Sequence, residues 1–69
     1  MKVSARNRFS GNVKHLVKGP VSTEVKVTIA AGIDVVAVIS TASASELELA
    51  VGKPVQVLIK ASSVILGID

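Results

Sequence analysis

The chain has 69 residues, contains no cysteine and one histidine, and carries a net charge of +3 at pH 7. The absence of cysteine excludes disulfides, thiolate metal sites and thiol nucleophiles, and a single histidine leaves too few ligands for a zinc or iron centre. The positive charge favours an anionic partner, which can be a nucleic acid, a membrane surface or a small oxyanion.

The small size of the chain limits its core. A chain of this length buries only about 60% of its unfolded surface, and without disulfides or metals the remaining source of stability is oligomerisation. Hydrophobic residues make up 49% of the chain and aromatic residues 1%, so the apolar surface is mostly small aliphatic side chains that pack well between subunits. No apolar run approaches the roughly 20 residues of a membrane span, and the N-terminal sequence lacks the apolar region of a signal peptide. We expect one domain over residues 1–69 in a cytoplasmic, oligomeric protein.

The first predicted strand covers residues 9–17, where apolar and polar residues alternate. The alternation predicts Val13, His15 and Val17 on one face, and Gly11 indicates a bulge or a sharp bend. His15 has no nucleophile or carboxylate near it in the sequence that would make it a catalytic base. We interpret it as a packed or interface residue.

The remaining predicted elements are four strands and one helix. The strands cover residues 22–30, 35–40, 54–61 and 62–68. The helix covers residues 44–49, because Ser43 and Glu46 have the spacing of a capping box, in which each side chain satisfies a backbone N–H at the helix start. Five strands, one short helix and a bent first strand are typical of an OB-like barrel, so the predicted fold class is all-β.

Three short segments are rich in hydrogen-bond donors. They are Ser4, Arg6 and Asn7 before the first strand, residues 40–45 leading into the helix, and Lys60, Ala61 and Ser62 at the end of the fourth strand. Arginine offers a rigid fork of donors and serine and asparagine add neutral ones, so the first segment suits an oxyanion. Each segment also has a structural explanation: basic residues that discourage edge pairing, hydroxyls that cap a helix, and a solvated lysine. Taken singly, none of the three is specific.

Together and in this order, the segments resemble the Mop family of molybdate-binding proteins, also called molbindins, and the related TOBE domains. The similarity lies in "SARN" at residues 4–7, "GNV" at 11–13, "ISTASASEL" at 39–47 and "VGKPVQVLIKASSVIL" at 51–66. It covers essentially the whole chain, and the combination of "SARN" with "IKASSV" is its most specific part.

The resemblance implies an OB-like barrel assembled as a hexamer, a trimer of dimers, that holds molybdate or tungstate between subunits. The implied oxyanion ligands are Ser4, Arg6, Asn7, Thr41, Ala42, Ser43, Lys60, Ala61 and Ser62, of which Ala42 and Ala61 would act through backbone groups. A second oxyanion site near the trimer axis is implied at Gly19, Pro20, Val21 and Ser22. In neither site does a side chain coordinate a metal ion directly.

The chemistry of the donor segments agrees with this ligand. Molybdate at neutral pH is a dianion without a proton, so a pocket of donors matches it and a carboxylate would repel it. The five acidic residues are scattered and form no pair suited to acid–base catalysis, so we expect a protein that is not an enzyme. We predict a molybdate or tungstate binder for storage and homeostasis.

Two alternatives stay open. An OB-type nucleic-acid-binding module fits the fold and the basic charge, but such modules stack bases on aromatic side chains and this chain has one Phe and no Tyr or Trp. The other is a bare assembly module whose charges serve only solubility.

Overall fold

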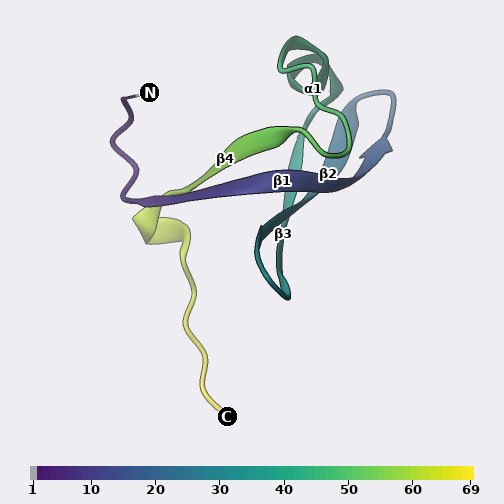
Figure 1. The fold of residues 1–69 in the computed structure, drawn as a ribbon. Coiled ribbons are helices and arrows are strands. Elements are labelled where there is room, and N and C mark those ends of the chain that lie inside the picture. The colour runs from purple at the N-terminus through teal and green to yellow at the C-terminus, as the bar shows by residue number, and fades with distance from the viewer. Residues whose placement is uncertain (1) are drawn as a thin grey trace.

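The computed structural model describes residues 2–69, so Met1 of the predicted domain lies outside the described residues. The elements are β1 (Asn7–Lys18), β2 (Ser22–Ala30), β3 (Ile33–Ser40), α1 (Thr41–Glu46), β4 (Pro54–Ile59) and a short 3₁₀ helix, η1 (Ala61–Ser63). The four strands form one antiparallel sheet in the order β3-β2-β1-β4 (Figure 1). No helix within residues 2–69 is long and apolar enough to cross a membrane.

Four of the five predicted strands are confirmed. The strand over residues 22–30 matches β2 in full, and the other three differ from the observed strands by at most two residues at either end. The fifth is wrong for this chain, because residues 62–68 contain the end of η1 and an extended tail that pairs with no strand among the described residues. The sheet therefore has four strands and is not closed into the predicted five-stranded barrel.

A β-bulge bends β1. The register of β1 against β2 shifts between Val13 and His15. Val13 is 2% exposed and Val17 is 51% exposed, whereas the half-buried Leu16 packs against the core after the bulge. The extra residue at a bulge changes which side chains point inward. The prediction that Val13, His15 and Val17 share one face is therefore wrong, and His15 is exposed in this chain.

Gly11 lets β1 lie against β2 without a side chain between them. A Cβ at this position would lie 2.6 Å from the carbonyl oxygen of Thr28 and 2.8 Å from Cγ1 of Val27. Real Cβ atoms do not approach backbone so closely, so β2 would have to move to accommodate one. The prediction of a bulge at Gly11 is wrong in its position, because the register shift follows Val13 and the absence of a side chain at Gly11 instead permits close packing.

The helix α1 begins three residues earlier than predicted. Ser40 is its N-cap, and the Ser40 hydroxyl oxygen accepts a hydrogen bond of 3.0 Å from the Ser43 backbone N–H. Because Ser43 already lies in the first turn, the predicted capping box of Ser43 and Glu46 is wrong. At the other end, Lys53 Nζ donates to the Leu47 carbonyl oxygen at 2.6 Å, which satisfies a carbonyl that the helix leaves free.

The core is small and is built from residues of β1 and β2. Its buried cluster is Val13, Val25 and Val27, and six partly buried residues pack against it: Leu16, Ile29, Ile39, Leu49, Val55 and Val57. Thr23 is also buried, at 1% exposed. Several apolar side chains around this cluster stay in contact with water.

Replacing Gly11 with alanine is expected to lower the free energy of unfolding by about 1–3 kcal/mol, the usual cost of overpacking a close-packed site. The cause is the contact of the new Cβ with the Thr28 carbonyl oxygen. Urea denaturation followed by circular dichroism measures the change. Ser45→Ala, at an exposed position of α1, serves as the control and should stay close to the parent protein. Equal stability of the two variants would contradict the packing argument.

Candidate functional site

The pairing of β1 with β4 brings together two donor segments from opposite ends of the sequence. Asn7 lies opposite Ile59 at the end of this antiparallel pair, so the chain before Asn7 runs beside the chain after Ile59. The two segments line one open hollow of about 480 Å³. Its lining residues are Ser4, Ala5, Arg6, Lys60, Ala61 and Ser62. Asn7 itself belongs to the paired strand and does not line the hollow.

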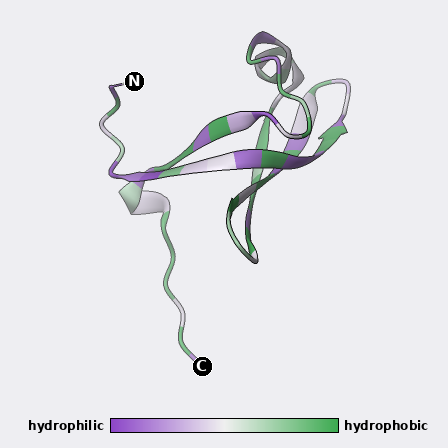
Figure 2. Ribbon diagram, viewed as in Figure 1, coloured by the Kyte–Doolittle hydropathy of each residue, from purple (hydrophilic) through white to green (hydrophobic). Residues whose placement is uncertain are grey.

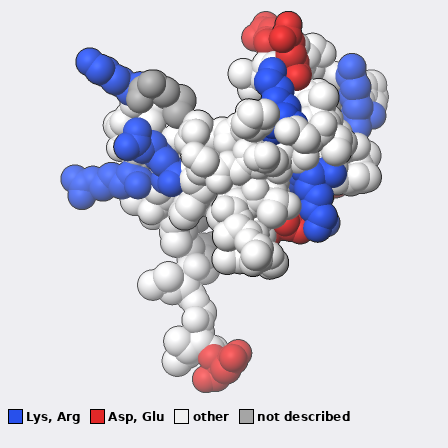
Figure 3. Space-filling model, viewed as in Figure 1, with Lys and Arg blue, Asp and Glu red and all other residues white. Residues whose placement is uncertain are grey.

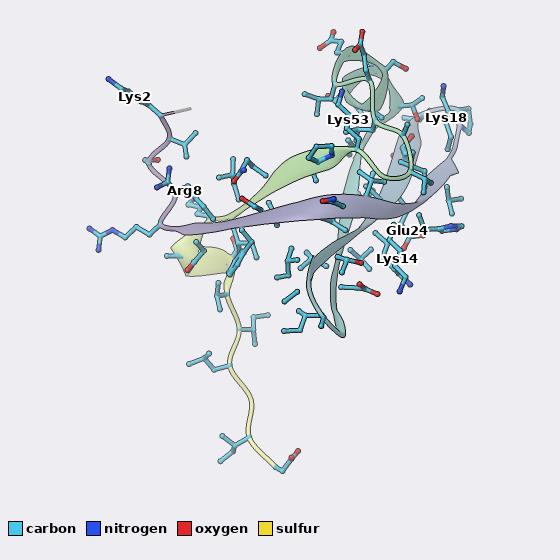
Figure 4. All side chains as sticks on the ribbon, viewed as in Figure 1. Lys2, Arg8, Lys14, Lys18, Glu24 and Lys53 are labelled. Carbon is cyan, nitrogen blue, oxygen red and sulfur yellow. The ribbon has the colours of Figure 1, made fainter. Side chains whose placement is uncertain are left out.

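The side chains that line the hollow are free to bind. Within residues 2–69, no hydrogen bond or ion pair engages the side chains of Ser4, Arg6 or Lys60. Figure 3 shows Lys and Arg side chains gathered at this end of the molecule, with no Asp or Glu beside them in that view. Figure 4 labels two basic residues at this end of the molecule, Lys2 and Arg8, which add positive charge near the hollow but do not line it. The hollow is therefore a surface of donors and positive charge.

Backbone groups at the hollow add to these donors. After β4 the chain turns through η1, where the Ser63 N–H donates to the Lys60 carbonyl oxygen at 2.9 Å. The N–H groups of Ala61 and Ser62 have no acceptor in the described part of the chain. A bound anion would satisfy these two groups together with the side-chain donors.

The third donor segment lies elsewhere in the chain. Thr41, Ala42 and Ser43 form the first turn of α1, which does not line the hollow. Figure 1 shows α1 on the other side of the molecule from the N-terminal segment and η1. A single copy of the chain thus divides the predicted ligands between two separate surfaces.

Thr41 uses both of its donors within the chain. Its backbone N–H donates to the Val21 carbonyl oxygen at 2.8 Å, and its hydroxyl donates to the Gly19 carbonyl oxygen at 2.7 Å. The buried Thr23 hydroxyl lies 2.8 Å from the Thr41 hydroxyl and is the donor of that pair, because the Thr41 proton is already engaged. Thr41 therefore connects α1 to the loop between β1 and β2, and keeps no donor for an anion.

The other two residues of this turn do keep a donor. The Ser43 hydroxyl accepts a hydrogen bond of 2.8 Å from the Ser40 hydroxyl, so its own proton remains available. The Ala42 N–H has no acceptor among residues 2–69. Both groups lie beside the Gly19–Ser22 loop that Thr41 holds, where the Gly19 N–H donates to the Ser22 carbonyl oxygen at 2.9 Å. The structure thus brings the second predicted site next to the helix start.

Sequence reasoning missed Thr23, although a signal was present. Thr23, Val25 and Val27 are spaced two residues apart, so they lie on the same inward face of β2. Applying this spacing to Thr23 would have placed it in the core. Its hydroxyl needs a partner when buried, and Thr41 is the residue that supplies one.

One acidic residue, Asp34, is paired, and it does not line the hollow. The pKa of Asp34 is lowered, first by the hydrogen bond from Thr28 Oγ1 at 2.7 Å and then by that from Lys14 Nζ at 3.0 Å. Both partners favour the charged carboxylate. Among residues 2–69, no group of three or more His, Cys, Asp or Glu side chains is placed to hold a metal ion.

Comparison with known proteins identifies the family. Residues 3–66 match the model of the TOBE domain, so the chain belongs to the TOBE domain family. Proteins named for the binding of molybdate or of molybdenum-pterin are homologous to it. The predicted resemblance to the Mop family and TOBE domains is confirmed.

Three known proteins show how far the similarity extends. The chain is 45% identical over all of its 69 residues to the molybdenum transport protein ModE of Herbaspirillum seropedicae, and spans 26% of that protein. It spans about a quarter of the length of the ModE relatives it matches.

Among solved structures, the molybdate-binding protein from Sporomusa ovata is 34% identical, with a TM-score of 0.91 over 99% of this chain and 100% of that one. The cytoplasmic molybdate-binding protein ModG, with molybdate bound, is 44% identical, with a TM-score of 0.83 over 88% of this chain and 43% of that one. These matches support the predicted OB-like fold.

Replacing Thr41 with valine is expected to lower the free energy of unfolding by about 1–3 kcal/mol, because the Gly19 carbonyl and the buried Thr23 hydroxyl lose their partner. Thr41→Ser keeps the hydroxyl and should recover most of the loss. Urea denaturation of both variants measures the difference. A valine variant as stable as the serine variant would show that the hydroxyl does not connect α1 to the loop.

Proposed function

We propose that this protein binds molybdate, and tungstate in the same sites, for storage and homeostasis of the anion in the cytoplasm. Each anion lies between copies of the chain in a homo-oligomer, a hexamer made of three dimers. The observation that carries the proposal is the hollow at the β1–β4 end, which collects unpaired donors and no carboxylate. Membership of the TOBE family and the similarity to two molybdate-binding proteins support the choice of ligand.

The division of donors supports a site shared between copies. Burying a dianion is costly unless most of its oxygens accept hydrogen bonds. The hollow offers Ser4, Arg6, Lys60 and the two free N–H groups of η1, but it is open to solvent on its outer side. The free donors of Ala42 and Ser43 on a second copy would complete the shell. Charge-assisted hydrogen bonds from Arg6 and Lys60 would be its strongest contacts.

The donor-only shell also gives selectivity. Phosphate near neutral pH carries a proton that needs an acceptor, and the lining of the hollow has no carboxylate to provide one. Sulfate is unprotonated, so it has to be rejected by its smaller size.

A second oxyanion site is proposed at Gly19, Pro20, Val21 and Ser22. The carbonyl oxygens of Gly19 and Val21 accept hydrogen bonds from Thr41, so these two acceptors are occupied by the protein itself. The loop therefore has fewer free acceptors that would repel an anion, and the free Ala42 N–H next to it can donate to one.

Replacing Arg6 with alanine is expected to weaken molybdate binding by about 1.5–3 kcal/mol, the range for a hydrogen bond to a charged group. Arg8→Ala is the matched control, because Arg8 lies two residues further along, opposite Leu58, and does not line the hollow. Calorimetric titration with molybdate measures both. Equal affinities for the two variants would remove Arg6 from the site.

Tungstate is expected to displace molybdate, whereas phosphate at the same concentration should not, because the shell provides donors only. Competition measured by equilibrium dialysis distinguishes the anions. Displacement by phosphate would contradict the donor-only site. A short single-stranded oligonucleotide is added in a parallel experiment, and tight binding of it would instead favour the nucleic-acid module.

A further inference from the structure

The helix α1 has little apolar packing to hold it in place. Among residues 41–46, Ala44 is the buried one, and Figure 2 shows the helix in mostly pale and hydrophilic colours. A helix of six residues is too short to be stable through its own hydrogen bonds. Contacts at its two ends therefore have to fix its position, and Thr41 supplies those at the first end.

Lys53 holds the other end of α1 (Figure 4). Its Nζ donates to the Leu47 carbonyl oxygen at 2.6 Å and to the Glu48 carbonyl oxygen at 3.2 Å. A cation is favourable at this end of a helix because the last carbonyl groups are free and partly negative. Glu48 has a φ of 54°, a left-handed conformation that is costly for a residue with a Cβ. The two hydrogen bonds from Lys53 support this turn.

The backbone of Lys53 is fixed to the sheet. Its carbonyl oxygen accepts a hydrogen bond of 3.0 Å from the N–H of the buried Val13, and its own N–H donates to the Ala50 carbonyl oxygen at 3.0 Å. β4 begins at the next residue, Pro54, and pairs with β1. The ammonium group therefore connects the end of α1 to a fixed point beside the core.

A series of hydrogen bonds leads from Lys53 to the Ser43 hydroxyl. Lys53 Nζ donates to the Leu47 carbonyl oxygen, and the Leu47 N–H donates to the Ser43 carbonyl oxygen at 2.9 Å. The Ser43 N–H donates to the Ser40 hydroxyl oxygen at 3.0 Å, and the Ser40 hydroxyl donates to Ser43 Oγ at 2.8 Å. The last of these bonds leaves the Ser43 proton free to donate.

We propose that Lys53 is a positioning residue for oxyanion binding: through the end of α1, it holds the Ser43 hydroxyl where it can donate to the anion. Lys53 does not itself touch the anion, because two carbonyl oxygens at the far end of the helix engage its ammonium group. This role rests on the proposed function, in which Ser43 is a ligand of the anion.

A double-mutant cycle tests this role with molybdate as the ligand. Lys53→Met keeps the aliphatic stem and removes the ammonium group, and it should weaken molybdate binding by roughly two- to tenfold, the effect of one misplaced hydrogen bond. Lys53→Arg keeps a cation and should recover most of the affinity. In a chain that carries Ser43→Ala, Lys53→Met should have little further effect, because the hydroxyl that it positions is gone. Calorimetric titration gives the affinities at a temperature where circular dichroism shows every variant folded.

Lys26→Met is the matched control, because it removes the same charge from an exposed position of β2 that lies in neither proposed site. It should bind molybdate as the parent protein does. Hydrogen exchange without molybdate is a second readout. Lys53→Met should speed exchange at the Leu47 and Glu48 amides, because the end of α1 opens more often, and Lys26→Met should not.

Three results would overturn the role of Lys53. They are equal affinities of Lys53→Met and Lys26→Met, an undiminished effect of Lys53→Met in the Ser43→Ala chain, and unchanged exchange at the Leu47 and Glu48 amides. Failure of the parent protein to bind molybdate would instead contradict the proposed function, so the two failures are distinguishable.

Discussion

The antiparallel pairing of β1 with β4 is the interaction on which the rest of the molecule depends. β1 and β2 are the two inner strands of the sheet, and β1 pairs with β2 on one side and with β4 on the other. At the bulge, the Val13 N–H donates to the Lys53 carbonyl oxygen at 3.0 Å, and the Gly52 N–H donates to the Val13 carbonyl oxygen at 2.7 Å. These bonds fix the start of β4 on β1, and the register then carries the other end of the pair to Asn7 and Ile59. A slip in this register would separate Arg6 from Lys60.

In a single copy, the core is only partly covered and the anion donors lie on two separate surfaces. The core leaves an apolar groove between its two edge strands while an apolar tail lies in water. The donors are divided between the hollow at one end of the sheet and the first turn of α1. The proposed assembly completes the donor shell through contact with a second copy. Anion binding and assembly would then stabilise each other by linkage.

Much of the fold was predictable from the sequence because local patterns determine it. The alternation in β2 is uninterrupted, and the predicted range matches the observed strand in full. The bulge after Val13 turns Leu16 toward the core and leaves Val17 exposed, and because both residues are apolar the sequence pattern did not reveal this change. The helix start was misplaced because Ser40 and Ser43 can both cap, and only the geometry at the end of β3 selects Ser40.

The site was predictable in part for similar reasons. The types of residue in the hollow were evident as donors, and the strand register that joins them follows from the fold. The engagement of Thr41 by Gly19 and Val21 was not evident, because a hydroxyl in a sequence does not reveal its partner. Likewise, the apolar alternation of the tail predicts a strand, but the tail pairs with no strand among the described residues.

Subunit complementation tests the central claim, a site shared between copies, most directly. Arg6→Ala and Ser43→Ala, each of which should bind molybdate weakly alone, are refolded together and titrated. If the hollow of one copy meets α1 of another, some mixed sites contain both intact residues, and tight binding returns in part. Arg6→Ala mixed with Lys60→Ala is the control, because both defects lie in one hollow and no mixed site can be whole. Recovery in the first mixture alone is predicted; equal behaviour of the two mixtures, or unimpaired binding by Ser43→Ala, would contradict the account.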